Sequence, residues 1–141
     1  SSANMIVFFG ATAYVRLDGW LLRMARAMER HGEAQYGCMG NRGAGAVYPH
    51  LRTTGIWCSP KLFNEYPHKI TNPGQRHPFE HGPNCFTEFV RRRGLKNWLV
   101  LTSGEYLWEQ WDSAPEGFHR GGQRDMLSGD HLSCPPYHCC E

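Results

Sequence analysis

The residue types best suited to catalysis gather in one short segment, His77-Pro78-Phe79-Glu80-His81. Two histidines one helical turn apart can hold a zinc ion while the glutamate acts as a base, which is the pattern of inverted zinc peptidases. That chemistry requires an uninterrupted helix, but Pro78 stands inside the segment and Gly82-Pro83 follows it directly. We therefore expect no zinc peptidase, and we expect Glu80 and His81 at or just before a helix N-terminus, where the carboxylate is either a helix cap or a general base.

Soft metal ligands gather near the C-terminus: His131, Cys134, His138, Cys139 and Cys140. Their chemistry suits tetrahedral zinc, but structural zinc sites normally use two separated ligand pairs. The remaining cysteines, 38, 58 and 85, are scattered along the chain. Two interpretations stay open, a zinc-stabilised interaction domain and a thiol-bearing tail without metal.

Polar recognition side chains lie among aromatic residues in three segments, 50–57, 76–84 and 105–124. A sugar offers C–H faces on which Trp and Tyr stack, and hydroxyls that Arg, Glu, Asp, His and Asn bind. The pattern therefore predicts a saccharide site. The candidate substrate-binding residues are Arg52, Thr53, Trp57, His81, Trp111 and Arg120. The alternative is that the tryptophans, Trp57 and Trp111 included, pack in the core.

Composition excludes several classes of protein. With 141 residues and 16.1 kDa, the chain fits one α/β domain over residues 1–141. A net charge of +2 is too weak to steer it onto nucleic acid. No apolar stretch reaches the roughly 18 residues needed to span a bilayer. The glycine-rich segment 40–45 lacks the Gly-Lys-Ser/Thr of a phosphate loop, and no G-x-S-x-G nucleophile motif is present.

The first apolar segment, Met5 to Phe9, leads into Ala11-Thr12-Ala13 and resembles a signal peptide with its cleavage site. No positive residue precedes it, so a buried strand is the better interpretation. Without a secretory signal the six cysteines are expected to be thiols, which favours the cytoplasm.

Strands and helices are expected to alternate along the chain. We predict strands over 5–15, 34–39 and 97–102, extended chain over 47–58, helices over 18–32, 59–66 and 83–93, and a loop over 67–78. Beyond residue 103 we expect irregular chain, with at most a short helix over 123–127. Strand, helix and strand in this order are typical of a parallel crossover, so we predict an α/β or α+β fold with a mixed sheet, flanking helices and long loops. An incomplete sheet exposes an edge, through which we expect homo-oligomers.

Four segments in this order resemble the C-terminal half of a GT-A-type, family 2-like, nucleotide-sugar glycosyltransferase. They are Ile6 to Val15 running into Trp20-Leu21, Arg52-Thr53-Thr54-Gly55-Ile56-Trp57, Phe79-Glu80-His81-Gly82, and Arg91-Arg92-Arg93-Gly94-Leu95. The tail Gly117-Phe118-His119-Arg120-Gly121 is similar to the closing histidine loop of such enzymes. The likeness spans nearly the whole chain and implies a mixed α/β sheet.

The resemblance also implies functional roles. In that family an acidic residue ahead of the helix that matches 83–93 deprotonates the acceptor hydroxyl, and Glu80 is the matching residue. A late histidine, here His119, helps hold the Mn or Mg ion that neutralises the diphosphate leaving group, with Arg120 near the phosphates.

The sequence departs from the family at two places. Gly10-Ala11-Thr12 stands where the family has a metal-binding Asp-x-Asp, and only four residues precede Met5, where the nucleotide-binding half belongs. The resemblance therefore predicts a glycosyltransferase-like module that is either active or incomplete and inactive. The alternatives are a non-catalytic α/β module that binds a saccharide or a protein, and the zinc-stabilised domain.

Overall fold

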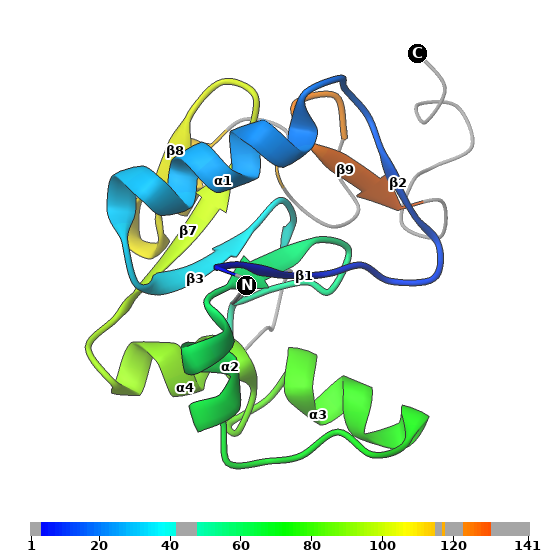
Figure 1. Ribbon diagram of the computed structural model, residues 1–141, viewed down its shortest axis with the longest axis vertical. Helices are drawn as coiled ribbons and strands as arrows, with labels where there is room; N and C mark the ends of the chain where they lie inside the picture. The colour runs from blue at the N-terminus through cyan, green and yellow to red at the C-terminus, as the bar shows by residue number, and fades with distance from the viewer. Residues whose placement is uncertain (1–3, 42–47, 115–116, 118–122, 131–141) are drawn as a thin grey trace.

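The computed structural model describes residues 4–41, 48–114, 117 and 123–130, and a five-stranded mixed sheet lies at its centre (Figure 1). In spatial order its strands are β1 (Ile6–Phe8), β6 (Ile56–Cys58), β3 (Ala34–Gly37), β7 (Lys96–Val100) and β8 (Glu105–Leu107). Strands β3 and β7 run parallel, whereas the other neighbouring pairs are antiparallel. The predicted α/β class with a mixed sheet and flanking helices is confirmed.

Helices cover both faces of this sheet (Figure 1). On one face lies α1 (Trp20–His31); on the other lie α2 (Pro60–Glu65), α3 (Arg76–Glu80) and α4 (Phe86–Arg92). Alternating strand residues fill the two layers: Trp57 packs with the α1 face, and Cys58 with the cluster of α2, α3 and α4. Within the described residues no helix has the length and apolar character required to cross a bilayer.

The helix predicted over 18–32 is observed as α1, which begins at Trp20 and ends at His31. Met24 and Ala27 are fully buried at helical spacing, and the Trp57 indole donates to the Met24 carbonyl at 3.1 Å. The residue before the helix is Gly19, whose φ of 74° suits glycine, and no side chain caps it. Gly32 ends the helix, as predicted.

The predicted single strand over 5–15 is wrong, because the chain turns at residues 10–13. Ala13 N–H donates to the Gly10 carbonyl at 3.0 Å, and the chain then enters β2 (Ala13–Val15). β2 pairs with β9 (Ser128–Asp130) in a separate sheet, side by side in Figure 1. β1 and β3 do share a direction, but β6 lies between them. The turn after β1 becomes one wall of the site.

The segment before α4 also differs from the prediction. A 3-10 helix, η1 (Pro73–Gln75), continues into α3, so the predicted loop over 67–78 is partly helical. Pro78 lies in the first turn of α3, where a missing N–H breaks no hydrogen bond. Glu80 is the last residue of α3, not the start of a helix.

The remaining helices and strands agree with the prediction in part. Helix α4 begins at Phe86 after Cys85, later than the predicted residue 83, whereas α2 begins at Pro60 behind the Ser59 cap as predicted. Residues 123–127 form no helix, and Met126 instead bridges Leu101. Not predicted were β8, β9, the 3-10 helix η2 (Trp108–Ser113) and the pairing of β4 (Gly40–Asn41) with β5 (His50–Leu51).

Candidate functional site

A polar cleft lies between the turn after β1 and the C-terminal end of α3. We call it the polar cleft; it is lined by Gly10, Ala11, Thr12, Ala13, Arg52, Thr53, Thr54, Arg76, Glu80 and Asp130. Its volume is about 330 Å³, which lies at the lower end of the roughly 300–1,000 Å³ of small-molecule sites. Two carboxylates and two guanidinium groups are among its lining groups, so both hydrogen-bond donors and acceptors face the space.

The Glu80 carboxylate is held by one residue. Thr53 donates to its Oε2 twice, from the backbone N–H and from the side-chain hydroxyl, each at 2.6 Å. Among the hydrogen bonds of the described residues, none engages Oε1. One oxygen of Glu80 is thus fixed, and the other can accept a hydrogen bond from a ligand.

The position of Thr53 follows from a turn between β5 and β6. Arg52 N–H donates to the Met39 carbonyl at 2.8 Å, and Gly55 N–H reaches back to the Arg52 carbonyl at 3.5 Å. Gly55 packs so closely that a Cβ there would stand 2.5 Å from the Cys38 sulfur. Glycine is therefore required at position 55, and the turn that presents Thr53 to Glu80 is fixed from behind.

Electrostatics keep Glu80 ionised. Burial opposes its charge, but the hydrogen bonds from Thr53 and the nearby positive charge of Arg52 outweigh that effect, so the pKa of Glu80 lies below its usual value. Burial also lowers the pKa of His50, which lies close enough to Glu80 for their charges to interact. At neutral pH Glu80 is an anion beside a neutral His50.

The second carboxylate, Asp130, comes from β9 and is nearly buried. Thr12 donates to its Oδ1 at 2.7 Å, and the Gln123 side chain binds the Asp130 backbone N–H and carbonyl at 2.8 and 3.2 Å. The turn Gly10-Ala11-Thr12 lacks a carboxylate of its own, and the fold brings Asp130 to that same turn. Sequence reasoning missed Asp130, Thr12 and Arg76 as site residues.

Two arginines complete the polar cleft. Arg52 has a buried Nε with no hydrogen-bond acceptor among the described residues. Arg76 is exposed on the first turn of α3. Both guanidinium groups can donate to hydroxyl or phosphate oxygens of a ligand.

Of the predicted site residues, the structure brings Glu80, Arg52 and Thr53 together. His81 follows α3 and lies beside the cleft lining, its ring 4.9 Å from that of His50 and 5.4 Å from that of His77. His119 and Arg120 lie outside the described residues.

Trp57 and Trp111 occupy the core, which corrects their expected role in stacking on a sugar. Trp57 is fully buried and stacks on Tyr36 at 5.6 Å. Trp111 is 2% exposed, and its indole donates to the Tyr106 carbonyl. Neither ring offers a face to a ligand, because strand alternation and the packing of η2 turn both rings inward.

Metal ligands do not assemble in the part of the chain that the structure describes, where no group of three His, Cys, Asp or Glu side chains could hold an ion. His77 and His81 are therefore not part of such a group. Cys38, Cys58 and Cys85 are buried free thiols, and burial raises the pKa of Cys58 to about 12. The cysteines and histidines from His131 to Cys140 lie outside the described residues.

Compared with protein-family models, with curated proteins and with solved structures, the chain matches none. The chemistry of the polar cleft is therefore the basis for a functional proposal.

Proposed function

We propose that the polar cleft binds a sugar and that the chain is a glycosyltransferase-like module in which Glu80 takes the proton of an acceptor hydroxyl. The observation that carries this proposal is the Glu80 carboxylate itself, which keeps one oxygen available at the wall of a cleft. Asp130, Arg52 and Arg76 surround the same space. Hydroxyl groups both donate and accept hydrogen bonds, so this mixture of groups suits a sugar.

In the proposed reaction the acceptor hydroxyl donates a hydrogen bond to Oε1 of Glu80. The acceptor oxygen forms a bond to the anomeric carbon of a nucleotide sugar, and the bond from that carbon to the diphosphate breaks with its electron pair leaving on the diphosphate. The hydroxyl proton passes to Glu80 and from there to solvent. Glu80 is ionised at neutral pH, so its carboxylate is in the form that accepts a proton.

The resemblance adds a divalent ion, Mn or Mg, with His119 among its ligands; when bound, it would neutralise the diphosphate. Arg76 is an exposed residue of the polar cleft. Its guanidinium group would add a positive charge from the protein itself near the diphosphate leaving group.

A second candidate is a saccharide-binding module without chemistry. One observation favours it: two hydrogen bonds from Thr53 and the charge of Arg52 stabilise the Glu80 anion, which weakens it as a base. Such an anion binds hydroxyls firmly without taking their protons.

Thermal shift and transfer assays with one pair of variants distinguish these candidates. Nucleotide diphosphate sugars and free sugars are added, with and without Mn²⁺, to the wild type, to Glu80→Gln and to Glu29→Gln, an exposed control on α1. We expect a ligand to raise the melting temperature of the wild type and the control but not of Glu80→Gln. Transfer of sugar to an acceptor, lost in Glu80→Gln, supports the transferase; binding without transfer supports the binding module. A ligand shift that Glu80→Gln retains in full contradicts both.

A further inference from the structure

An apolar groove opens directly beside the polar cleft. Phe8, Phe9, Phe63 and Phe79 supply aromatic wall, and Ile70 and Pro73 extend it. The groove has a volume of about 620 Å³, larger than the polar cleft. Its inner rings pack on one another, with the Phe8 and Phe63 centroids 4.9 Å apart, so this wall is built into the core rather than formed by loose side chains.

The groove and the polar cleft form one continuous site. Gly10, Ala11, Thr53 and Arg76 line both. Helix α3 contributes to both parts of this site: Phe79 lines the groove, and the adjacent Glu80 lines the polar cleft. A ligand group at Thr53 can therefore reach the Glu80 carboxylate on one side and the aromatic wall on the other.

Two large apolar side chains at this groove are exposed to solvent. Phe9 and Ile70 are each 40% exposed, and they come from the turn after β1 and from the segment ahead of η1. Exposed apolar surface that gathers around a cavity is typical of ligand-binding grooves. Because the groove continues into a cleft with four charged side chains, an occupant that fills both halves must be polar at one end and apolar at the other.

We infer that the ligand is an amphipathic glycoside, with its sugar in the polar cleft and an aryl or alkyl group against the aromatic wall of the groove and Ile70. This inference rests on the proposed function for the sugar half and adds the chemical class of the group attached to it. The apolar group sets affinity, and the sugar is presented to Glu80.

Calorimetric titration of the whole chain with matched probes tests this inference. The probes are phenyl and methyl glycosides of glucose, galactose, mannose and N-acetylglucosamine, and phenol alone. We expect at least one phenyl glycoside to bind about tenfold more tightly than its methyl partner. Phe9→Ala and Ile70→Ala each reduce this gain and leave the methyl glycoside unchanged. Leu21→Ala, an exposed apolar control on α1, changes neither.

Other outcomes overturn the inference in distinguishable ways. If phenyl and methyl glycosides bind equally and Glu80→Gln weakens both, the proposed function is still supported, but the inference of an amphipathic ligand is wrong. If phenol binds as tightly as the phenyl glycosides and Glu80→Gln has no effect, both the proposed function and the amphipathic ligand are contradicted. Absence of binding by every phenyl glycoside at millimolar concentration also overturns the inference. So does self-association in sedimentation runs that Phe9→Ala and Ile70→Ala abolish, because a second copy would then occupy the groove.

Discussion

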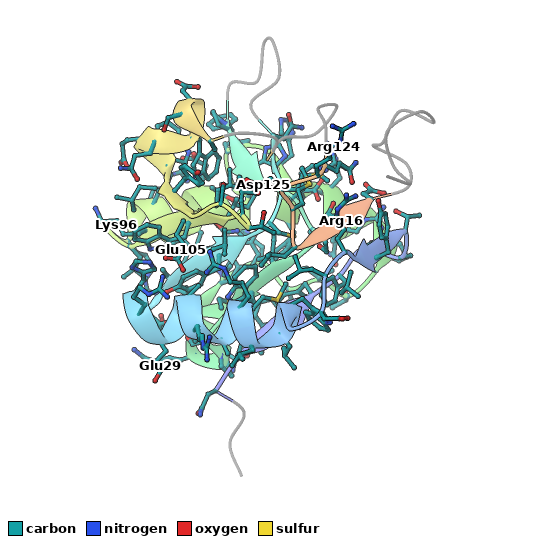
Figure 2. The ribbon with its side chains drawn as sticks, turned by 90° about the horizontal axis from the view of Figure 1, so that it is seen from above. Arg16, Glu29, Lys96, Glu105, Arg124 and Asp125 are labelled. Atoms are coloured by element: carbon teal, nitrogen blue, oxygen red, sulfur yellow. The ribbon has the colours of Figure 1, made fainter. Side chains whose placement is uncertain are left out.

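Two glutamates in this molecule are held in opposite ways. Glu105 on β8 lies between the sheet and α1, where both of its oxygens are used (Figure 2). Arg23 donates to Oε1 at 2.8 Å, and Arg30 and His31 bind Oε2 at 2.6 and 2.9 Å. Glu80 accepts hydrogen bonds from the neutral donors of Thr53 on one oxygen only, and the residue lines the polar cleft.

The difference separates a structural carboxylate from a candidate functional one. All three partners of Glu105 come from α1, so the group fastens that helix to an edge strand and has no oxygen left for a ligand. Both groups have a lowered pKa, so a perturbed pKa alone would not separate them. The available oxygen of Glu80 and the cleft beside it distinguish the two glutamates.

The largest expected effect is on stability, and it comes from one substitution made at both sites. Glu105→Gln removes the charge that three partners bind, so we expect a loss of about 1–3 kcal/mol in the free energy of unfolding. Glu80→Gln keeps an oxygen that can accept from Thr53, so its loss should stay below about 1 kcal/mol. Urea denaturation of both variants and of the exposed Glu29→Gln control measures this order. A greater loss in Glu80→Gln than in Glu105→Gln would show that Glu80 is the structural group.

The pH dependence of stability should differ between the same variants. Folding lowers the pKa of Glu105, because the hydrogen bonds and charges of His31, Arg23 and Arg30 outweigh desolvation. Its contribution is therefore complete above the unfolded value of about 4.5 and is lost as the pH falls through the lower folded value. Denaturation curves from neutral pH down to strongly acidic pH should show a shallower loss in Glu105→Gln than in the wild type. Parallel curves would contradict the role of the ionised carboxylate.

A smaller effect is expected on the protonation of Glu80. Thr53→Val removes the hydroxyl donor and keeps the backbone N–H, so the pKa of Glu80 should rise toward its usual value. Thr53→Ser keeps the donor and should leave the pKa unchanged. Carbon NMR of the side-chain carboxyl through an acid titration measures both. No difference between the two variants would mean that the backbone N–H and Arg52 alone set the ionisation.

The smallest expected effect is on the association of two copies through an edge of the sheet. One edge, β8, lies in the region of Glu105, and the other, β1, lies in the region of Glu80. β8 carries the Glu105 cluster and packs against η2, whereas β1 ends at the turn that lines the cleft. The expected association of two copies through an edge should therefore use β1, and with three residues in that strand it should be weak. Sedimentation equilibrium over a wide concentration range measures it. A strict monomer at the highest concentration would contradict it.

Local sequence signals were enough to predict much of the fold. The helices predicted over 18–32 and 59–66 and the strands predicted over 34–39 and 97–102 lie close to the observed elements α1, α2, β3 and β7. Such features depend on residues near one another in the chain. The split of the first strand and the existence of β9 depend on pairing across more than a hundred residues, as in the bond from Thr12 to Asp130. A strand of Ser, Gly and Asp carries no β-branched residue that would reveal it.

The candidate site divides in the same way. Glu80, Arg52 and Thr53 could be nominated because of their residue types in polar segments. Arg76 lay within the predicted segment 76–84 but was not singled out, and Asp130 could not be nominated, since only the fold brings β9 to the same cleft as α3. The prediction for Trp57 failed because the two faces of β6 are both buried, so an aromatic residue there packs in the core.

The backbone amide of Thr53 offers the most direct test of the central claim, that the available oxygen of Glu80 makes the polar cleft a sugar site. This N–H donates to Glu80, so its NMR signal should respond when a ligand hydroxyl binds the same carboxylate. The wild type and Glu80→Gln are titrated with the panel of nucleotide sugars and glycosides. We predict a saturable shift of the Thr53 amide in the wild type and none in Glu80→Gln. Titration of the full panel without movement of that amide, or an identical shift in the variant, would contradict the account.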